Sequence, residues 1–395
     1  MKVGGLRALL AALAVAALSV GLAACGGGSS SDSTGSSESG STGSESSGSE
    51  SSGSVNKTVI AFSPTTENNF VALWTKAAKE TFEEAGYSVK FYQNNFDQSE
   101  EDQQVQQVLA TGAEPGAFIY WPSDNEAGIA SARRLAAVAP VIQNNNNVLP
   151  EAEEFVSAYG GVNDYADGVV AGELALKMRE AFEKEGKKKK GEDNTIIVTY
   201  GGGYQAGIDR VKGIEETTKD DPFNVIETVE TGFTVEEAFQ SVAQVLPKLK
   251  SEGIDYVIGV SEFPTLGAIE ALNEAGYKPG QDVGVVSGNC QTNFDHLING
   301  EEWGTSIQSP IAEGLVTANV VINYLENGEK TQGPGTELTL APDPDKKPPL
   351  PKIPAYRNFY PLPLILTEGK PPAEAKKIIK ETTLWGQTPE ELCAK

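Results

Sequence analysis

"TVIAFSPTTENNFVALWTKAAKETFEEAG" (residues 58–86) pairs a short apolar run with a longer amphipathic one. Four of the first five residues are β-branched or aromatic, and the run stops at Ser-Pro, which is typical of a buried strand. Apolar residues then recur at the spacing of one helix face: Phe70, Leu73, Trp74, Ala77 and Ala78. Gly86 ends the predicted helix. A strand followed at once by a helix is the repeating unit of a parallel α/β sheet.

The same alternation continues along the chain. Further apolar runs predict strands at "SVKFY", "AFIY" and "PVIQ" and then, after a long helix, at "TIIVT", "NVIETV", "YVIGV", "VGVVS" and "TSIQ". Helical patterns separate nearly all of them. Two similar series, each roughly 100 to 150 residues long, predict two doubly wound α/β lobes with parallel sheets.

The N-terminus is typical of an export signal. Residues 1–24 contain Lys2 and Arg7, an apolar stretch at Ala8–Leu18, and then "LAAC" ending at Cys25. The apolar stretch is shorter than a membrane-spanning helix and has the flanks of a secretory peptide. "LAAC" resembles a bacterial lipobox, which implies that Cys25 is lipidated. The alternative is an ordinary secretory peptide with an incidental cysteine.

Residues 25–54 form a predicted tether. After Cys25 the segment contains only Gly, Ser, Thr, Asp and Glu, so it cannot bury apolar surface. As a flexible coil it spans roughly 30 Å. We therefore expect a folded part of about 340 residues, long enough for two domains, that reaches the membrane only through a lipid.

Charge and composition exclude several classes of function. The net charge of -24 argues against nucleic acid as a partner, because its backbone is bound by Lys and Arg. The chain has one histidine, His296, whereas zinc sites and Ser-His-Asp triads need more ligands or bases. We expect no metal and no cofactor. Catalysis by paired carboxylates stays open.

Polar and aromatic residues follow the predicted strands, at the edge where open parallel sheets bind ligands. "SPTTENNF" follows Phe62, Trp121 directly follows "AFIY", and four asparagines follow Gln143. Amides offer a donor and an acceptor side by side, and an anionic ligand would call for more Arg or Lys. The pattern predicts a small, neutral, polyhydroxylated ligand. "YGGGYQ" lacks the spacing of a nucleotide-binding loop.

Several motifs together carry a family resemblance. Six motifs occur in this order along the chain: "NFVALWTKAAKETFEEAG", "FDQSEEDQQVQQVLATGAEPGAFIYWPSDNEA", "GVNDYADGVVAGE", "DRVKGIEE", "TLGAIEALNEAGY" and "GTSIQSPIAEG". They resemble the ribose-binding class of periplasmic binding proteins, which serve sugar-type ABC transporters and share their fold with the sensor domains of lac-repressor-like regulators. The resemblance covers nearly all of Val55–Gly328.

The resemblance implies a set of ligand contacts. Carried over by motif, the contact positions fall on Glu67, Asn69, Phe70, Asn145, Asn146, Arg210, Phe233, Ser261, Asn289 and Gln308. Three positions depart from the family pattern: an Asp-Arg pair has become Asn145-Asn146, an Asp has become Asn289, and an Asn has become Ser261. A common aldose such as ribose is therefore not implied. Trp121 joins the set by its position, whereas Trp74 is assigned to the core.

The resemblance also implies an architecture and a mechanism. The N-terminal lobe would comprise 55–162 and 309–359, and the C-terminal lobe 163–308 and 360–395, joined by three crossovers. The protein would be a monomer that closes on its ligand and passes it to an ABC permease. If Cys25 carries lipid, Cys290 and Cys393 remain for a disulfide or stay as two buried thiols. Their expected place on one lobe favours the disulfide.

Two other functions are compatible with the sequence. The chain can instead be the ligand-sensing subunit of an envelope receptor, which the sequence does not distinguish from a transport subunit. It can also be a secreted glycosidase that uses carboxylates such as Glu67 or Glu262. As a ligand contact, Asn146 is expected to cost roughly tenfold in affinity when it is replaced by Ala.

Overall fold

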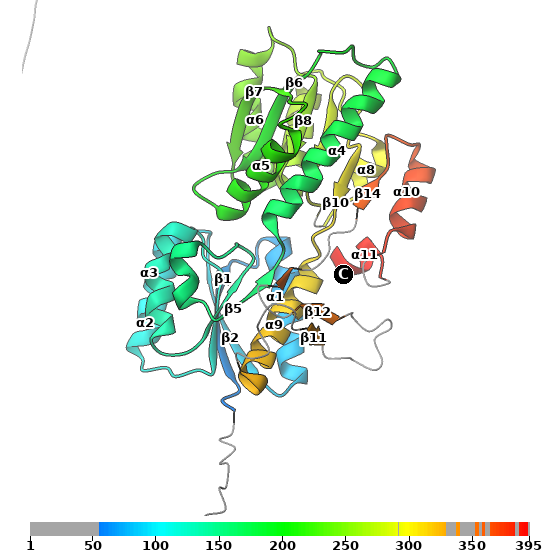
Figure 1. The fold of residues 1–395 in the computed structure, drawn as a ribbon. Coiled ribbons are helices and arrows are strands. Elements are labelled where there is room, and N and C mark those ends of the chain that lie inside the picture. Colours follow the sequence, from blue (N-terminus) through cyan, green and yellow to red (C-terminus); the bar gives the residue numbers. More distant parts are fainter. Residues whose placement is uncertain are drawn as a thin grey trace, which may run out of the picture. The chain divides into compact units, whose positions relative to one another are not determined.

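The computed structural model describes residues 55–290, 292–328, 337–339, 352–354, 358–359, 364–383 and 387–393. Two parallel sheets, each flanked by helices, form two lobes (Figure 1). This confirms the predicted fold class. The signal peptide, the tether and Cys25 lie outside the described residues. Within the described part of the chain, no helix combines the length and the apolar character needed to cross a membrane.

The N-terminal lobe contains six parallel strands in the order β13-β5-β4-β3-β1-β2. Its strands are β1 (Thr58–Pro64), β2 (Ser88–Asn94), β3 (Ala117–Tyr120), β4 (Val141–Asn144), β5 (Ala158–Gly161) and β13 (Asn358–Phe359). Its helices are α1 (Asn69–Glu84), α2 (Gln98–Ala110), α3 (Asn125–Ala136), the 3-10 helix η1 (Pro150–Phe155) and α9 (Pro310–Asn327). We did not predict β5, because "AYGG" is short and its two glycines give no strand pattern.

The C-terminal lobe contains four parallel strands in the order β7-β6-β8-β9. Its strands are β6 (Asn194–Tyr200), β7 (Asn224–Thr231), β8 (Tyr256–Gly259) and β9 (Gly284–Ser287), with the antiparallel pair β10 (Gly304–Ser306) and β14 (Leu364–Leu366) beside them. Its helices are α4 (Asp164–Lys184), α5 (Gln205–Thr218), α6 (Val235–Leu249), α7 (Glu262–Glu274), α8 (Asp295–Asn299) and α10 (Pro372–Glu381). A small antiparallel pair comprises β11 (Glu337–Thr339) and β12 (Lys352–Pro354).

Helix starts explain why polar residues gather at one edge of the first sheet. Asn68, Asp97 and Asp124 each cap the helix that follows a strand, and each side chain accepts hydrogen bonds from backbone N–H groups of the first turn. Such caps satisfy donors that the helix itself leaves unpaired. Polar capping residues therefore line the carboxyl edge of the sheet. This is the edge at which open parallel sheets bind ligands.

The described parts of the C-terminal tail contact both lobes. β14 pairs with β10 and α10 packs against α8 of the C-terminal lobe, as expected. The last described helix, α11 (Pro389–Cys393), packs against α9 instead, where the Ser309 hydroxyl donates to the Leu392 carbonyl at 2.6 Å. The buried side chains of α11, Leu392 and Cys393, belong to one apolar cluster that includes Trp74 of the N-terminal lobe and Leu297 of the C-terminal lobe. α11 thus packs where the two lobes adjoin, and the lobe boundaries expected from the sequence stay a prediction.

Cys290 and Cys393 are both buried free thiols. The disulfide considered from the sequence is not formed, and the alternative of two buried thiols is what the structure contains. The Cys290 thiol instead donates to the Asn293 carbonyl at 3.0 Å. Burial raises the pKa of the Cys290 thiol well above its usual range. Both sulfurs therefore stay protonated at neutral pH and behave as small apolar groups in the core.

Candidate ligand-binding site

A cavity lies where the carboxyl edges of the two sheets meet. The N-terminal lobe contributes Asn68, Phe70, Val71, Phe96, Trp121 and Asn145, the C-terminal lobe contributes Tyr200, Tyr204, Arg210, Phe233 and Phe263, and Gln308 comes from the crossover between β10 and α9. Seven of these twelve residues are aromatic and one is charged. The cavity therefore offers apolar faces with a few polar groups between them, which is the usual composition of a small-molecule site.

Aromatic rings form both walls. On one side Trp121 packs edge-on against Phe70, with ring centroids 6.2 Å apart, and against Trp74 behind it. On the other side Phe233 stacks on Tyr200 at 5.0 Å and meets Tyr204 edge-on. Phe96 of the N-terminal lobe stacks on Phe233 of the C-terminal lobe at 4.2 Å, nearly parallel. Trp74 is fully buried, which confirms its assignment to the core.

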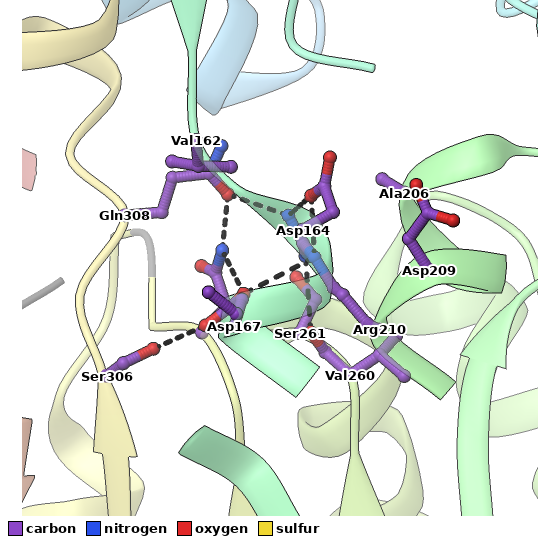
Figure 2. A network of polar contacts seen from close by, with 12 residues as sticks. Val162, Asp164, Asp167, Ala206, Asp209, Arg210, Val260, Ser261, Ser306 and Gln308 are labelled. Atoms are coloured by element: carbon purple, nitrogen blue, oxygen red, sulfur yellow. Dashed lines mark hydrogen bonds and ion pairs between the residues drawn. The ribbon is translucent and has the colours of Figure 1, made fainter. Parts of the chain in front are cut away.

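Arg210 is the centre of a buried polar network (Figure 2). Its Nε and Nη2 donate to Asp164 Oδ1 at 2.9 and 2.7 Å, and Nε lies 3.3 Å from Asp167 Oδ2. Nη1 donates to the Val260 carbonyl and Nη2 to Gln308 Oε1, the latter at 3.1 Å. Among the described residues that line the cavity, Arg210 is the only cation, and it already forms ion pairs with two carboxylates of the protein.

Two glycines let Arg210 reach these carboxylates. A Cβ on Gly168 of α4 would lie 1.9 Å from the Arg210 carbonyl oxygen, and one on Gly213 of α5 would lie 2.3 Å from the Tyr165 carbonyl oxygen. Only glycine permits such a close approach of two helix backbones. The first turn of α4, with Asp164 and Asp167, is therefore held against Arg210.

The carboxyl groups of this network have raised pKa values. Burial raises the pKa of Asp164 to about 7 and that of Asp167 to about 6, although Arg210 opposes both shifts. Burial acts to lower the pKa of Arg210, but Asp164 and Asp167 more than offset it, so the guanidinium stays charged. One cation shared by two buried carboxyls leaves excess negative charge, which desolvation disfavours.

Asn145 lines the cavity, as the family pattern implied. Its backbone adopts a left-handed conformation with φ of 62°, which Asn tolerates better than most residues. Its Nδ2 donates to Glu313 Oε1 at 2.9 Å, and its Oδ1 accepts from the Tyr204 hydroxyl, also at 2.9 Å. Tyr204 in turn accepts from Trp121 Nε1 at 3.1 Å. A chain of hydrogen bonds along the cavity wall thus links three residues of the N-terminal lobe through the Tyr204 hydroxyl of the C-terminal lobe.

Asn146, in contrast, does not line the cavity. Its Nδ2 donates to the Pro122 carbonyl at 2.9 Å, and its Oδ1 accepts from the Ala206 amide of α5 at 3.1 Å. Asn147 also reaches the C-terminal lobe, where its Nδ2 donates to Asp209 Oδ2 at 3.2 Å. Both polar atoms of Asn146 thus bind protein groups and connect the two lobes, and a contact between Asn146 and a ligand hydroxyl stays a prediction.

Four other predicted contacts lie away from the cavity lining. Glu67 and Asn69 are exposed, because Asn68 between them turns inward to cap α1. Ser261 is fully buried and accepts from the Tyr200 hydroxyl at 2.8 Å. Asn289 is fully buried behind Gln308 and donates to its Oε1 and, at 3.2 Å, to Asp167. These last two residues support cavity residues and do not themselves line the cavity.

Six of the ligand contacts predicted from the sequence line the cavity: Phe70, Trp121, Asn145, Arg210, Phe233 and Gln308. The site residues named from the sequence did not include five lining residues. Tyr200 ends β6, and the other four lie within a few residues after a strand: Asn68, Phe96, Tyr204 and Phe263. Sequence reasoning also missed Glu313, a fully buried carboxylate of α9 that accepts from Gln308 Nε2 at 2.6 Å. Nothing in "SPIAEG" distinguishes Glu313 from a surface acid, so burial had to be seen in the structure.

A family profile described as "Periplasmic binding protein domain" matches residues 60–330. The match spans most of the chain and includes every cavity-lining residue. The chain belongs to this family. Among curated proteins none matches the chain at a significant level.

Solved structures of this family's fold are similar to the chain. A galactofuranose binding protein is 19% identical with a TM-score of 0.63, and the alignment covers 83% of this chain and 99% of that one. A Mycobacterium smegmatis protein in complex with β-D-fucofuranose is 18% identical with a TM-score of 0.61, covering 82% and 94%. A Bacillus halodurans ABC transporter solute binding protein with bound myo-inositol is 19% identical with a TM-score of 0.59, covering 70% and 91%. At these identities the likeness establishes the fold.

The carboxylates that the glycosidase hypothesis named do not line the cavity. Glu67 is exposed, and Glu262 is buried and accepts from the Thr292 amide and hydroxyl. Within the described part of the chain, no group of three or more His, Cys, Asp or Glu side chains has the arrangement of a metal site. The family comprises binding proteins, and the cavity's residues are those of a binding site.

Proposed function

We propose that this family member is an extracytoplasmic solute-binding protein. It is tethered to the cell membrane through lipidated Cys25, captures a small neutral polyhydroxylated ligand between its lobes as a monomer, and delivers it to an ABC permease. The single observation that carries the proposal is the cavity itself. Aromatic walls from both lobes enclose a few amides and one guanidinium at the carboxyl edges of two parallel sheets.

The charge balance of the site supports a ligand without negative charge. An anionic ligand would need a cation with unused hydrogen-bonding capacity, but Arg210 already serves Asp164, Asp167 and Gln308. Amides such as Asn145 and Gln308 suit hydroxyl groups, because each hydroxyl is a donor and an acceptor. The aromatic faces suit the C–H faces of a sugar or cyclitol ring. The similar structures are described with galactofuranose, fucofuranose and myo-inositol, all neutral polyhydroxylated rings.

Lobe closure supplies the capture step in this proposal. The polar chain from Trp121 through Tyr204 and Asn145 to Glu313 joins the lobes, because Tyr204 belongs to the C-terminal lobe and the other three residues belong to the N-terminal lobe. A ligand between the lobes adds contacts to both and shifts the population toward the closed form. A permease that binds the closed form then receives loaded protein in preference to empty protein.

A thermal-shift screen tests the proposal. The full chain is heated with neutral furanoses, pyranoses, polyols and cyclitols, and with the matching uronic acids as anionic controls. We expect at least one neutral compound to raise the melting temperature by several degrees, because a ligand at 100 times its Kd stabilises by about 2.7 kcal/mol. Stabilisation by the uronic acids alone would contradict the proposal.

A further inference from the structure

The loop after β3 carries one aromatic wall of the cavity and is held by α2. The loop begins with Trp121, and the Ser123 amide two residues later donates to Glu101 Oε2 of α2 at 3.0 Å. The next amide, that of Asp124, donates to Gln98 Oε1 at 3.0 Å. Two side chains from the first turns of α2 thus bind two successive backbone amides of this loop.

Glu101, which binds the Ser123 amide, is completely buried, which is unusual for a glutamate. Its second oxygen, Oε1, is buried as well and has no hydrogen-bond partner among the described residues. No lysine or arginine of the described chain forms an ion pair with it. A buried carboxylate without a counter-ion is strongly disfavoured, whereas the neutral carboxyl group keeps its bond to Ser123 at lower cost.

The charged and titratable groups around Glu101 are acidic or phenolic. Asp102 of α2 accepts from Gln98 and Ser131, Asp124 caps α3, and Tyr120 of β3 donates to the Gly128 carbonyl. Their proximity is visible in the pKa of Tyr120, which burial raises first and Glu101, Asp102 and Asp124 raise further. The pKa of Glu101 itself is raised to about 8, mainly by burial.

We propose that Glu101 is a positioning residue for ligand binding: its neutral carboxyl group holds the 121–124 loop, so that Trp121 stays in the cavity wall and keeps its hydrogen bond to Tyr204. When Glu101 ionises in its dry pocket, the loop loosens and the Trp121–Tyr204 contact weakens. The consequence for affinity rests on the proposed function, whereas the effect on Trp121 does not.

The direction of the pH effect follows from the two pKa values. The folded-state value of about 8 lies above the ordinary value for Glu of about 4.3. The stabilisation by the neutral group is therefore complete below about pH 4 and is lost as the pH rises through about 8. Tyr120 and Tyr204 do not ionise in this range, because burial raises their pKa values further.

The indole N–H of Trp121 provides a probe that needs no ligand. In a 15N spectrum of the full chain each tryptophan gives one indole signal, and Trp121→Phe assigns the signal of Trp121. From pH 6.5 to 9.5 we expect the Trp121 signal of the wild type to move with a midpoint near pH 8. In Glu101→Gln, which mimics the neutral carboxyl group, the transition near pH 8 should be absent, and only the change caused by Asp164, which has a pKa of about 7 and acts on Tyr204, should remain.

Glu126→Gln is the matched control, because it removes an exposed carboxylate from the first turn of α3 near the same loop. Its Trp121 signal should titrate like that of the wild type. The same transition in Glu101→Gln, or no transition in the wild type between pH 6.5 and 9.5, overturns the proposal. If Glu101→Gln does not fold, 13C-carboxyl labelling of wild-type glutamates decides. The Glu101 carboxyl must titrate with the Trp121 signal, and a titration near its ordinary value overturns the proposal.

Discussion

The two lobes contribute polar groups to the cavity in different ways. In the C-terminal lobe a guanidinium, Arg210, is satisfied by carboxylates of its own lobe and by Gln308 of the crossover. In the N-terminal lobe three consecutive amides, Asn145–Asn147, reach across to Tyr204, Ala206 and Asp209. The charged group thus stabilises one lobe, whereas the uncharged groups connect the two.

This difference predicts different phenotypes for the two regions. Removing the charge of Arg210 should lower the free energy of unfolding, because it leaves buried carboxylates without a partner. Removing an amide should act on the equilibrium between open and closed forms, because its partners regain water when the lobes separate. Variants of the two regions can therefore be distinguished by unfolding and by binding measurements.

Arg210→Met should have the largest effect. It leaves Asp164 and Asp167 buried without a counter-ion, so we expect the free energy of unfolding to fall by about 3–5 kcal/mol. Urea unfolding followed by circular dichroism measures it. Arg134→Met removes an exposed arginine of α3 and should change little. If the free energy of unfolding of Arg210→Met fell by less than 1 kcal/mol, the Arg210 network would not be a main source of this lobe's stability.

Asn146→Ala should weaken binding of every ligand by a common factor, roughly tenfold. The Pro122 carbonyl and the Ala206 amide lose their shared partner in the closed form, at about 1–3 kcal/mol. Titration calorimetry with each compound that stabilises the wild type measures the factor. Asn145→Ala, which alters the cavity lining, should instead change the rank order of the compounds. A changed rank order in Asn146→Ala would identify it as a ligand contact.

Tyr204→Phe should have a smaller effect, because it keeps the ring and removes only the hydroxyl. That hydroxyl donates to Asn145 and accepts from Trp121 Nε1, so about 1–2 kcal/mol of closed-form stability should be lost. The tryptophan emission spectrum and the ligand affinity report the change. Tyr165→Phe, at a tyrosine that is 42% exposed, is the control and should match the wild type. If Tyr204→Phe and Tyr165→Phe had the same ligand affinity and emission spectrum, the Tyr204 hydroxyl would not contribute to the stability of the closed form.

The acidic pair should make stability depend on pH. The pKa values of Asp164 and Asp167, about 7 and about 6 in the folded chain, lie above their ordinary value of about 3.9. Their neutral forms therefore stabilise the fold fully below about pH 4, and this contribution is lost as the pH rises to about 7. Melting temperatures from pH 5 to 8 should decline more steeply in the wild type than in Asp164→Asn. If the melting temperatures of the wild type and Asp164→Asn declined equally with pH, Asp164 would not be a source of the pH dependence.

Glu67→Gln and Asn69→Ala should have the smallest effects. Both side chains are exposed and lie outside the cavity lining, so ligand affinity should stay within a factor of two of the wild type. Asn68→Ala, between them, should weaken binding, because Asn68 lines the cavity and caps α1. Calorimetry of the three variants separates the positions. Equal losses in all three would place the whole 67–69 segment at the ligand.

The sequence predicted the architecture well because its signals are local. Apolar runs and helical spacing identify β1 and α1 directly. The family resemblance named Phe70, Asn145, Arg210 and Gln308 as ligand contacts, and these four residues line the cavity. β5 escaped prediction because a four-residue strand with two glycines has no periodic signal.

The finer assignments depend on geometry that spacing does not encode. Adjacent asparagines look equivalent in sequence, yet the left-handed backbone at Asn145 turns its side chain to the cavity and that of Asn146 to Pro122 and Ala206. The same limit applies to Glu101 and Glu313, which resemble surface acids until their burial is known.

The position of a bound ligand tests the central claim most directly. The compound with the largest thermal shift is titrated into the 15N-labelled chain while the indole signals of Trp121 and Trp303 are followed. Trp121 lines the cavity, whereas Trp303 is buried in the core of the C-terminal lobe. We expect the Trp121 signal to shift and saturate at one ligand per chain while the Trp303 signal stays in place. A stabilising compound that saturates the protein without moving the Trp121 signal would contradict the account.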